Sequence, residues 1–112
     1  MSMIIRGTTP TLTFNVKNEQ MDLAEIAEVW ITFKSKAGVR LVEKTYDIND
    51  VTIDATEKTI TLSLSQEDTL EFVNAPNGEM LVQVRLRMND DMAFASAIIE
   101  TSIGQILKDG VI

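Results

Sequence analysis

The chain has 112 residues, of which 45% are hydrophobic and 24% are charged. This length and balance predict one folded domain, residues 1–112, with a two-layer core rather than a disordered chain. The formal net charge is −7 and the basic residues are scattered, which argues against a nucleic acid or an acidic membrane surface as partner. The sequence contains no Cys and no His, so disulfides are excluded and the commonest general base and zinc ligands are missing.

Neither a signal segment nor a membrane span is expected. Residues 1–6 lack an apolar signal core, and no stretch approaches the ~20 apolar residues that a spanning helix needs. We therefore expect the protein to be made and kept in the cytoplasm.

Four runs alternate apolar and polar residues, which is typical of strands that bury one face in an antiparallel sheet. In chain order the runs are 11–16, 29–34, 59–64 and 80–88. The predicted inward side chains are Leu12, Phe14, Val16, Val29, Ile31, Phe33, Ile60, Leu62, Leu64, Met80, Val82, Val84, Leu86 and Met88.

Turn-forming residues separate these runs. Residues 36–38 predict a hairpin between the second run and a strand over 39–46. A short strand is expected over 51–53, and residues 56–58 and 89–91 predict further turns.

One segment breaks the alternation. Ser65 is followed by Gln66, Glu67 and Asp68, so Ser65 is expected to cap a helix whose dipole the two acids complement. The prediction is one or two helical turns near 66–73 that cross from one sheet to the other.

Residues 93–103 contain small residues that suit a helix and β-branched residues that favour a strand. A hairpin with Asp90 and Asp91 as its loop favours the strand, because it sets small side chains opposite large ones on the buried face. In this register the predicted partners of Met88, Leu86, Val84 and Val82 are Ala93, Ala95, Ala97 and Ile99.

About seven strands with one helical crossing predict an all-β fold, an immunoglobulin-like antiparallel sandwich. Trp30 lies on the third-strand candidate, but the Cys residues of antibody domains are absent. A partly open barrel is the main alternative.

No constellation for catalysis is evident, so we expect no enzyme, no cofactor and no metal site. The acidic cluster Asp47, Asn49, Asp50 and Asp54 lacks the Gly and the final Glu of a calcium loop, and its members are expected to be turn formers. Residues 7–10 lack the second Gly and the Lys of a phosphate loop.

Recognition of a protein partner is more plausible. In the hairpin register above, the outer face carries apolar groups flanked by arginines, a combination that protein interfaces favour. The candidate contact residues are Leu81, Arg85, Arg87, Phe94, Ile98 and Trp30. The alternative is that a neighbouring strand, a loop or the tail Val111-Ile112 covers them.

Four stretches carry a family resemblance: residues 4–10 (IIRGTTP), 65–70 (SQEDTL), 82–85 (VQVR) and 103–110 (IGQILKDG). They resemble small proteins encoded among the structural genes of tailed phages and prophages of Gram-positive bacteria. The resemblance implies a virion or morphogenesis component of the tail or head–tail region. Its implied partners are other phage structural proteins and copies of itself, with no small-molecule substrate, and its implied location is the bacterial cytoplasm during assembly and then the virion.

Two other functions stay open at this point. The first is a carbohydrate- or host-surface-binding module that uses Trp30, Tyr46 or Phe94 as a stacking platform. The second is an inhibitor of host machinery that mimics the charge of DNA. A net charge of −7 that is spread among positive residues gives this role little support.

Overall fold

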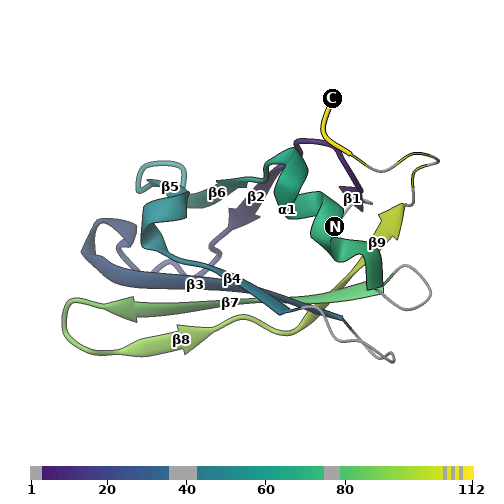
Figure 1. Ribbon diagram of the computed structural model, residues 1–112. Coiled ribbons are helices and arrows are strands. Elements are labelled where there is room, and N and C mark those ends of the chain that lie inside the picture. Colours follow the sequence, from purple (N-terminus) through teal and green to yellow (C-terminus); the bar gives the residue numbers. More distant parts are fainter. Residues whose placement is uncertain (1–3, 36–42, 75–78, 105, 107, 109) are drawn as a thin grey trace.

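A computed structural model describes residues 4–35, 43–74, 79–104, 106, 108 and 110–112, and it shows two β-sheets packed face to face (Figure 1). The strands are β1 (Ile4–Ile5), β2 (Thr11–Asn15), β3 (Ile26–Ser35), β4 (Glu43–Tyr46), β5 (Val51–Asp54), β6 (Thr59–Ser63), β7 (Glu79–Met88), β8 (Ala93–Ala95) and β9 (Ile99–Gly104). The helical segments are α1 (Gln66–Leu70) and the 3-10 turns η1 (Leu23–Glu25), η2 (Ile48–Asp50) and η3 (Glu71–Asn74).

The larger sheet has the strand order β1-β9-β7-β3-β4, and β8 also pairs with β7; the smaller sheet has the order β2-β6-β5. Every pairing is antiparallel except that of β1 with β9. The predicted sandwich is confirmed, and the barrel alternative is wrong because the strands form two separate sheets. The immunoglobulin-like classification stays a prediction: the strand order resembles that arrangement, but Trp30 faces solvent instead of the core.

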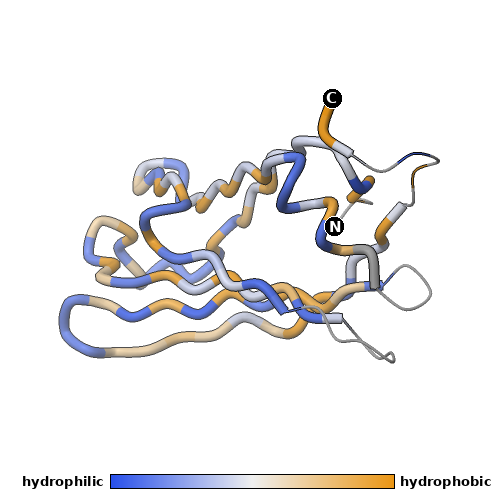
Figure 2. Tube along the Cα trace, in the orientation of Figure 1, coloured by the Kyte–Doolittle hydropathy of each residue, from blue (hydrophilic) through white to orange (hydrophobic). Residues whose placement is uncertain are grey.

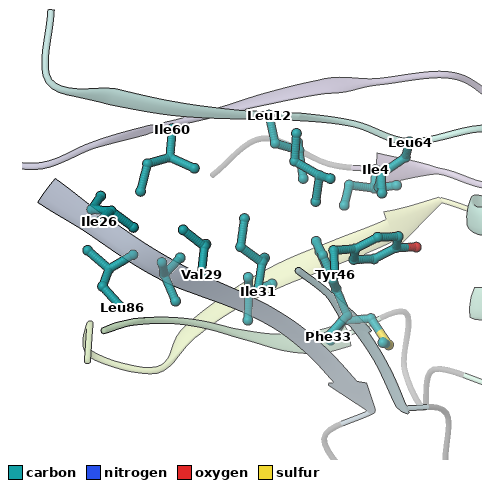
Figure 3. Packing of buried hydrophobic residues seen from close by; sticks show 14 of the residues in the cluster. Ile4, Leu12, Ile26, Val29, Ile31, Phe33, Tyr46, Ile60, Leu64 and Leu86 are labelled. Atoms are coloured by element: carbon teal, nitrogen blue, oxygen red, sulfur yellow. The ribbon is translucent and has the colours of Figure 1, made fainter. Parts of the chain in front are cut away.

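The core lies between the two sheets, where side chains from both layers meet (Figure 3). The period-two alternation that predicted these faces is visible along β7 in Figure 2. The predicted inward residues are buried, except that Phe14 and Val16 at the open side of β2 are only half-buried.

The helical crossing is confirmed as α1 followed by η3. The Ser65 hydroxyl accepts from the backbone N–H of Asp68 at 3.1 Å, and the Asp68 carboxylate accepts from the N–H of Ser65 at 2.9 Å. This reciprocal cap fixes where the helix begins. Phe72 then returns to the core and stacks on Phe33, with ring centroids 5.5 Å apart.

The predicted turns at 56–58 and 89–91 are confirmed, and Lys58 and Asp91 adopt positive φ there. The short strand expected over 51–53 is β5. The hairpin turn at 36–38 lies outside the described residues, as does the first half of the strand expected over 39–46, whose second half is β4.

Residues 93–103 form strands as predicted, in two pieces, but the register of the first piece is shifted by one residue. Val82 pairs with Ile99 as expected, whereas Leu86 pairs with Phe94 instead of Ala95. Ala93 and Ala95 are therefore exposed, and Phe94 packs against the core. The predicted outward position of Phe94 is wrong.

Ser96 accounts for the shift. Its hydroxyl accepts from the N–H of Val84 at 3.0 Å, and its own N–H donates to the Val84 carbonyl at 2.8 Å. The Ser96 carbonyl is bonded to the Gln83 side chain at 3.1 Å. The hydroxyl takes the place of a backbone carbonyl as acceptor, so this side of the ladder holds one extra residue between β8 and β9. The residues of β8 that face inward and outward are therefore exchanged relative to the prediction.

No helix in the described part of the chain is long and apolar enough to cross a membrane.

Candidate functional site

The solvent side of β3, β7 and β8 brings together Trp30, Arg85, Arg87, Ala93 and Ala95, which we call the outer face. Arg85 lies between Trp30 on β3 and Ala95 on β8, and Arg87 pairs with Ala93 in the next row. All five side chains are exposed. Because Ala93 and Ala95 have short side chains, the Trp and Arg side chains beside them are accessible to a partner.

Trp30 and Arg85 form the centre of this face. The Trp30 side chain is 48% exposed, and the Arg85 guanidinium lies 5.6 Å from the centre of its ring. A cation–π contact at an exposed site contributes about 0.5–1 kcal/mol. The contact holds two long side chains in one arrangement before any partner arrives.

Two carboxylates, those of Asp91 and Glu28, neighbour Arg87 on this face. Arg87 reaches Asp91 at 3.5 Å in an exposed pair, a geometry that contributes little. The carboxylate of Glu28, across from Arg87, accepts from the backbone N–H groups of Val29 at 2.9 Å and Ile48 at 3.1 Å.

The remaining predicted contact residues lie apart from this centre. Leu81 is half-buried in the row of Lys34 and Glu100, and Ile98 is 62% exposed just before β9. Phe94 is on the opposite side of the sheet. The structure thus brings together three of the six predicted residues, namely Trp30, Arg85 and Arg87.

Sequence reasoning missed Ala93 and Ala95 as members of the outer face. The signal was present in Ser96, whose hydroxyl can replace a backbone acceptor and shift the ladder. A period-two pattern alone does not reveal such a shift.

The tail does not cover this face. Ile112 exchanges two hydrogen bonds with the Gln66 side chain, at 2.9 and 3.3 Å, and so lies beside α1. Figure 1 shows the C-terminus on the far side of the molecule from β3, β7 and β8.

The aromatic platform that a carbohydrate module would use is not assembled. Tyr46 is buried at 8% exposure, Phe94 faces inward, and one face of the Trp30 ring is already occupied by Arg85.

Three of the four stretches that carry the phage resemblance meet at one end of the sandwich. Ile4 pairs with Ile103, the Arg6 guanidinium donates to the Leu70 carbonyl at 2.9 Å, and Thr69 donates to the Thr8 carbonyl at 2.9 Å. Gly7 has φ +76, and a Cβ there would lie 3.1 Å from Ile106. These stretches therefore tie both ends of the chain to α1.

The acidic cluster consists of turn acceptors, as predicted. Asp47 accepts from the N–H of Asn49 at 2.8 Å, Asp50 from that of Asp47 at 2.9 Å, and Asp54 from those of Thr56 and Glu57 at 3.0 Å. Within the described ranges, no group of three His, Cys, Asp or Glu residues is arranged to hold a metal ion.

A second polar cluster joins β4 to α1. The Lys44 ammonium lies 2.9 Å from Asp68 and 2.6 Å from Glu71. Partial burial alone lowers the pKa of Lys44, but the hydrogen bonds to Glu71 and Asp68 outweigh it and raise that pKa above its ordinary value. Lys44 thus stays charged, as an ion pair that anchors the helix requires.

No protein-family model matches this chain, and comparison with curated proteins yields no significant match.

Proposed function

We propose that the protein is a non-enzymatic virion or morphogenesis component of a tailed phage or prophage, associated with the tail, and that it acts through protein–protein contacts. The resemblance of the four stretches supports the phage assignment. On this proposal, the protein is made in the bacterial cytoplasm and then enters the virion. Its partners are other phage structural proteins and copies of itself.

The observation that carries the contact function is the exposed Trp30 with Arg85 stacked over it. Trp and Arg are the residues most enriched among those that dominate binding energy at interfaces. Because Trp30 and Arg85 already contact one another, these two side chains lose less conformational entropy when a partner covers them. The short side chains of Ala93 and Ala95 allow a partner to approach the sheet closely.

The test uses the proteins encoded by the neighbouring genes, which on this proposal include tail proteins. Each purified protein is mixed with this chain, and complexes are detected by size-exclusion chromatography with light scattering and quantified by calorimetry. We expect at least one stable complex, and we expect Trp30→Ala with Arg85→Ala to weaken it by about a hundredfold.

The matched control is Thr52→Ala with Glu57→Ala, two exposed positions on the smaller sheet and its turn. This control is expected to bind like the wild-type protein. Wild-type protein that stays monomeric and binds none of the tail proteins would count against the proposal, as would equal affinities for the two double variants.

A further inference from the structure

The smaller sheet leaves part of the larger sheet uncovered. β2 is the edge strand of the smaller sheet, and beside it lies a hollow of about 760 Å³. One wall is formed by residues 13–18, along β2 and just beyond it. The floor is the inner face of β7, β8 and β9, with Val84, Leu86, Phe94 and Ile99.

The hollow is lined in part by apolar side chains that resemble core residues but are incompletely buried. Phe14 and Val16 from one sheet and Phe94 from the other pack against the core but are only half-buried. Among the described residues that line the hollow, Lys17 is the one that carries a charge. A fourth strand beside β2 would cover these side chains, in the way that the first three strands cover the rest of the core.

The free edge of β2 offers backbone groups for such a strand. The Val16 N–H donates to the Lys58 carbonyl at 2.9 Å, and the Leu64 N–H donates to the Pro10 carbonyl at 3.0 Å. Because antiparallel ladders alternate, Thr11, Thr13 and Asn15 direct their backbone groups away from β6. No strand in the described part of the chain pairs with that side.

One end of the hollow is acidic. There it adjoins a second hollow of about 700 Å³, with Asn18, Met21 and Phe94 common to both. Met21, Met88 and Met92 supply an apolar, adaptable lining. Asp22, Glu25 and Asp90 are the charged residues among the described ones that line it, so this end complements positive charge.

We propose that the hollow binds an extended segment of a partner protein, which pairs with β2 as a fourth strand. Every second side chain of that segment is apolar and points into the hollow, since strand side chains alternate between faces. Lys or Arg flanks the segment at the end that reaches Asp22, Glu25 and Asp90. This goes beyond the function proposed above, because the hollow lies on the inner side of β7 and β8 and shares only Ala95 with the outer face.

A labelled synthetic peptide is the probe: Val and Thr alternate along it, and an Arg-Lys pair stands at each end. Fluorescence anisotropy measures its binding to the full chain, and amide hydrogen exchange followed by NMR locates it. We expect binding and at least a tenfold gain in exchange protection at Thr13 and Asn15. Ile53, on the opposite edge strand β5, is expected to be unchanged.

Charge complementarity is tested by Asp22→Asn with Glu25→Gln and Asp90→Asn. Asn and Gln preserve the hydrogen bonds that these side chains accept from Ala24, Asn89 and Met92. Removing three rim charges is expected to weaken peptide binding about tenfold.

The matched control for the rim is Asp47→Asn with Asp50→Asn and Asp54→Asn. It removes the same number of charges from turn acceptors that line neither hollow. We expect it to bind the peptide like the wild-type protein.

Backbone pairing is tested with the same peptide N-methylated at every second residue, which is expected to bind at least tenfold more weakly. Absence of binding by the unmodified peptide would overturn the proposal. So would undiminished binding of the N-methylated peptide, protection away from β2, or equal binding by the two triple variants. A dimer in which β2 pairs with β2 of a second copy would also overturn it.

Discussion

At the scale of single residues, the hydroxyl of Tyr46 is a buried polar atom that lacks a hydrogen-bond partner among the residues that the structure describes. The side chain is 8% exposed and packs edge-on against Phe33, with ring centroids 5.8 Å apart. Its oxygen is buried and meets no partner at hydrogen-bonding geometry among the described residues. Burial, and to a smaller extent the nearby carboxylates of Asp68 and Glu71, raise the pKa of the phenol above its ordinary value. Such a group lowers stability, because it gives up its bonds to water and gains none in return.

We therefore expect Tyr46→Phe to raise the free energy of unfolding by about 1 kcal/mol, measured by urea denaturation. Tyr46→Ala serves as the comparison and is expected to lower it by about 3 kcal/mol, because the ring contacts are lost. A Phe variant less stable than wild type would show that the hydroxyl is bonded in solution.

At the scale of elements, α1 is held by its own cap and by Lys44 of β4. Partial burial alone raises the pKa of Asp68, but hydrogen bonds from Ser65 and Lys44 outweigh it and lower that pKa. A carboxylate with a lowered folded pKa stabilises the protein above its unfolded pKa of about 3.9. The stabilisation is lost as the pH falls from there through the folded value.

The prediction is that the unfolding free energy falls below about pH 4, and that Asp68→Asn falls less steeply in this range. At neutral pH the variant is expected to lose about 1 kcal/mol, because Asn keeps the cap but not the ion pair. Both effects are measurable by urea titrations at several pH values.

Asp50→Asn is the control, because Asp50 holds the same capping position in η2 and forms no ion pair with a residue that the structure describes. Its curve shows how much of the flattening follows from the loss of a capping carboxylate alone. If both variants flatten the curve equally, the cap rather than Lys44 lowers the pKa of Asp68.

At the scale of the whole molecule, both ends of the chain depend on one buried arginine. Arg6 follows β1, is 4% exposed, and its guanidinium donates to the Leu70 carbonyl through two nitrogens, at 2.9 and 3.3 Å. Its own N–H donates to the Gly104 carbonyl at 3.0 Å. Strand β1, strand β9 and helix α1 are thus fastened to each other at one point.

We expect Arg6→Ala to lower the free energy of unfolding by about 3 kcal/mol, since the hydrogen bonds of a buried guanidinium to a partly buried carbonyl are lost. Unfolding is expected as one transition, with far-UV circular dichroism and Trp30 fluorescence coincident. Lys58→Ala is the matched control: its ammonium also donates to two backbone carbonyls, each at 3.1 Å, but at the surface. Loss of the Lys58 hydrogen bonds is expected to lower the free energy of unfolding by less than about 1 kcal/mol. Two separated unfolding transitions would contradict a single cooperative unit.

Local patterns predicted much of this structure because they report local causes. Alternation along β3, β6 and β7 identifies the buried face without knowledge of the partner strands. Ser65 signals the start of α1 because a cap needs only residues within one turn. For the candidate site, the same alternation correctly predicted that Trp30, Arg85 and Arg87 are exposed.

The sequence by itself thus determined where most of the described strands lie, where the crossing helix begins, and that turns lie at 56–58 and 89–91; it did not predict β1. Only the tertiary structure decided that Ser96 shifts the ladder, since that depends on Val84 across the sheet, and the shift turns Phe94 inward. It also decided that Arg6 is buried against Leu70 and that the smaller sheet ends at β2. Each of these outcomes depends on contacts between segments far apart in the chain, which no periodicity within one segment encodes.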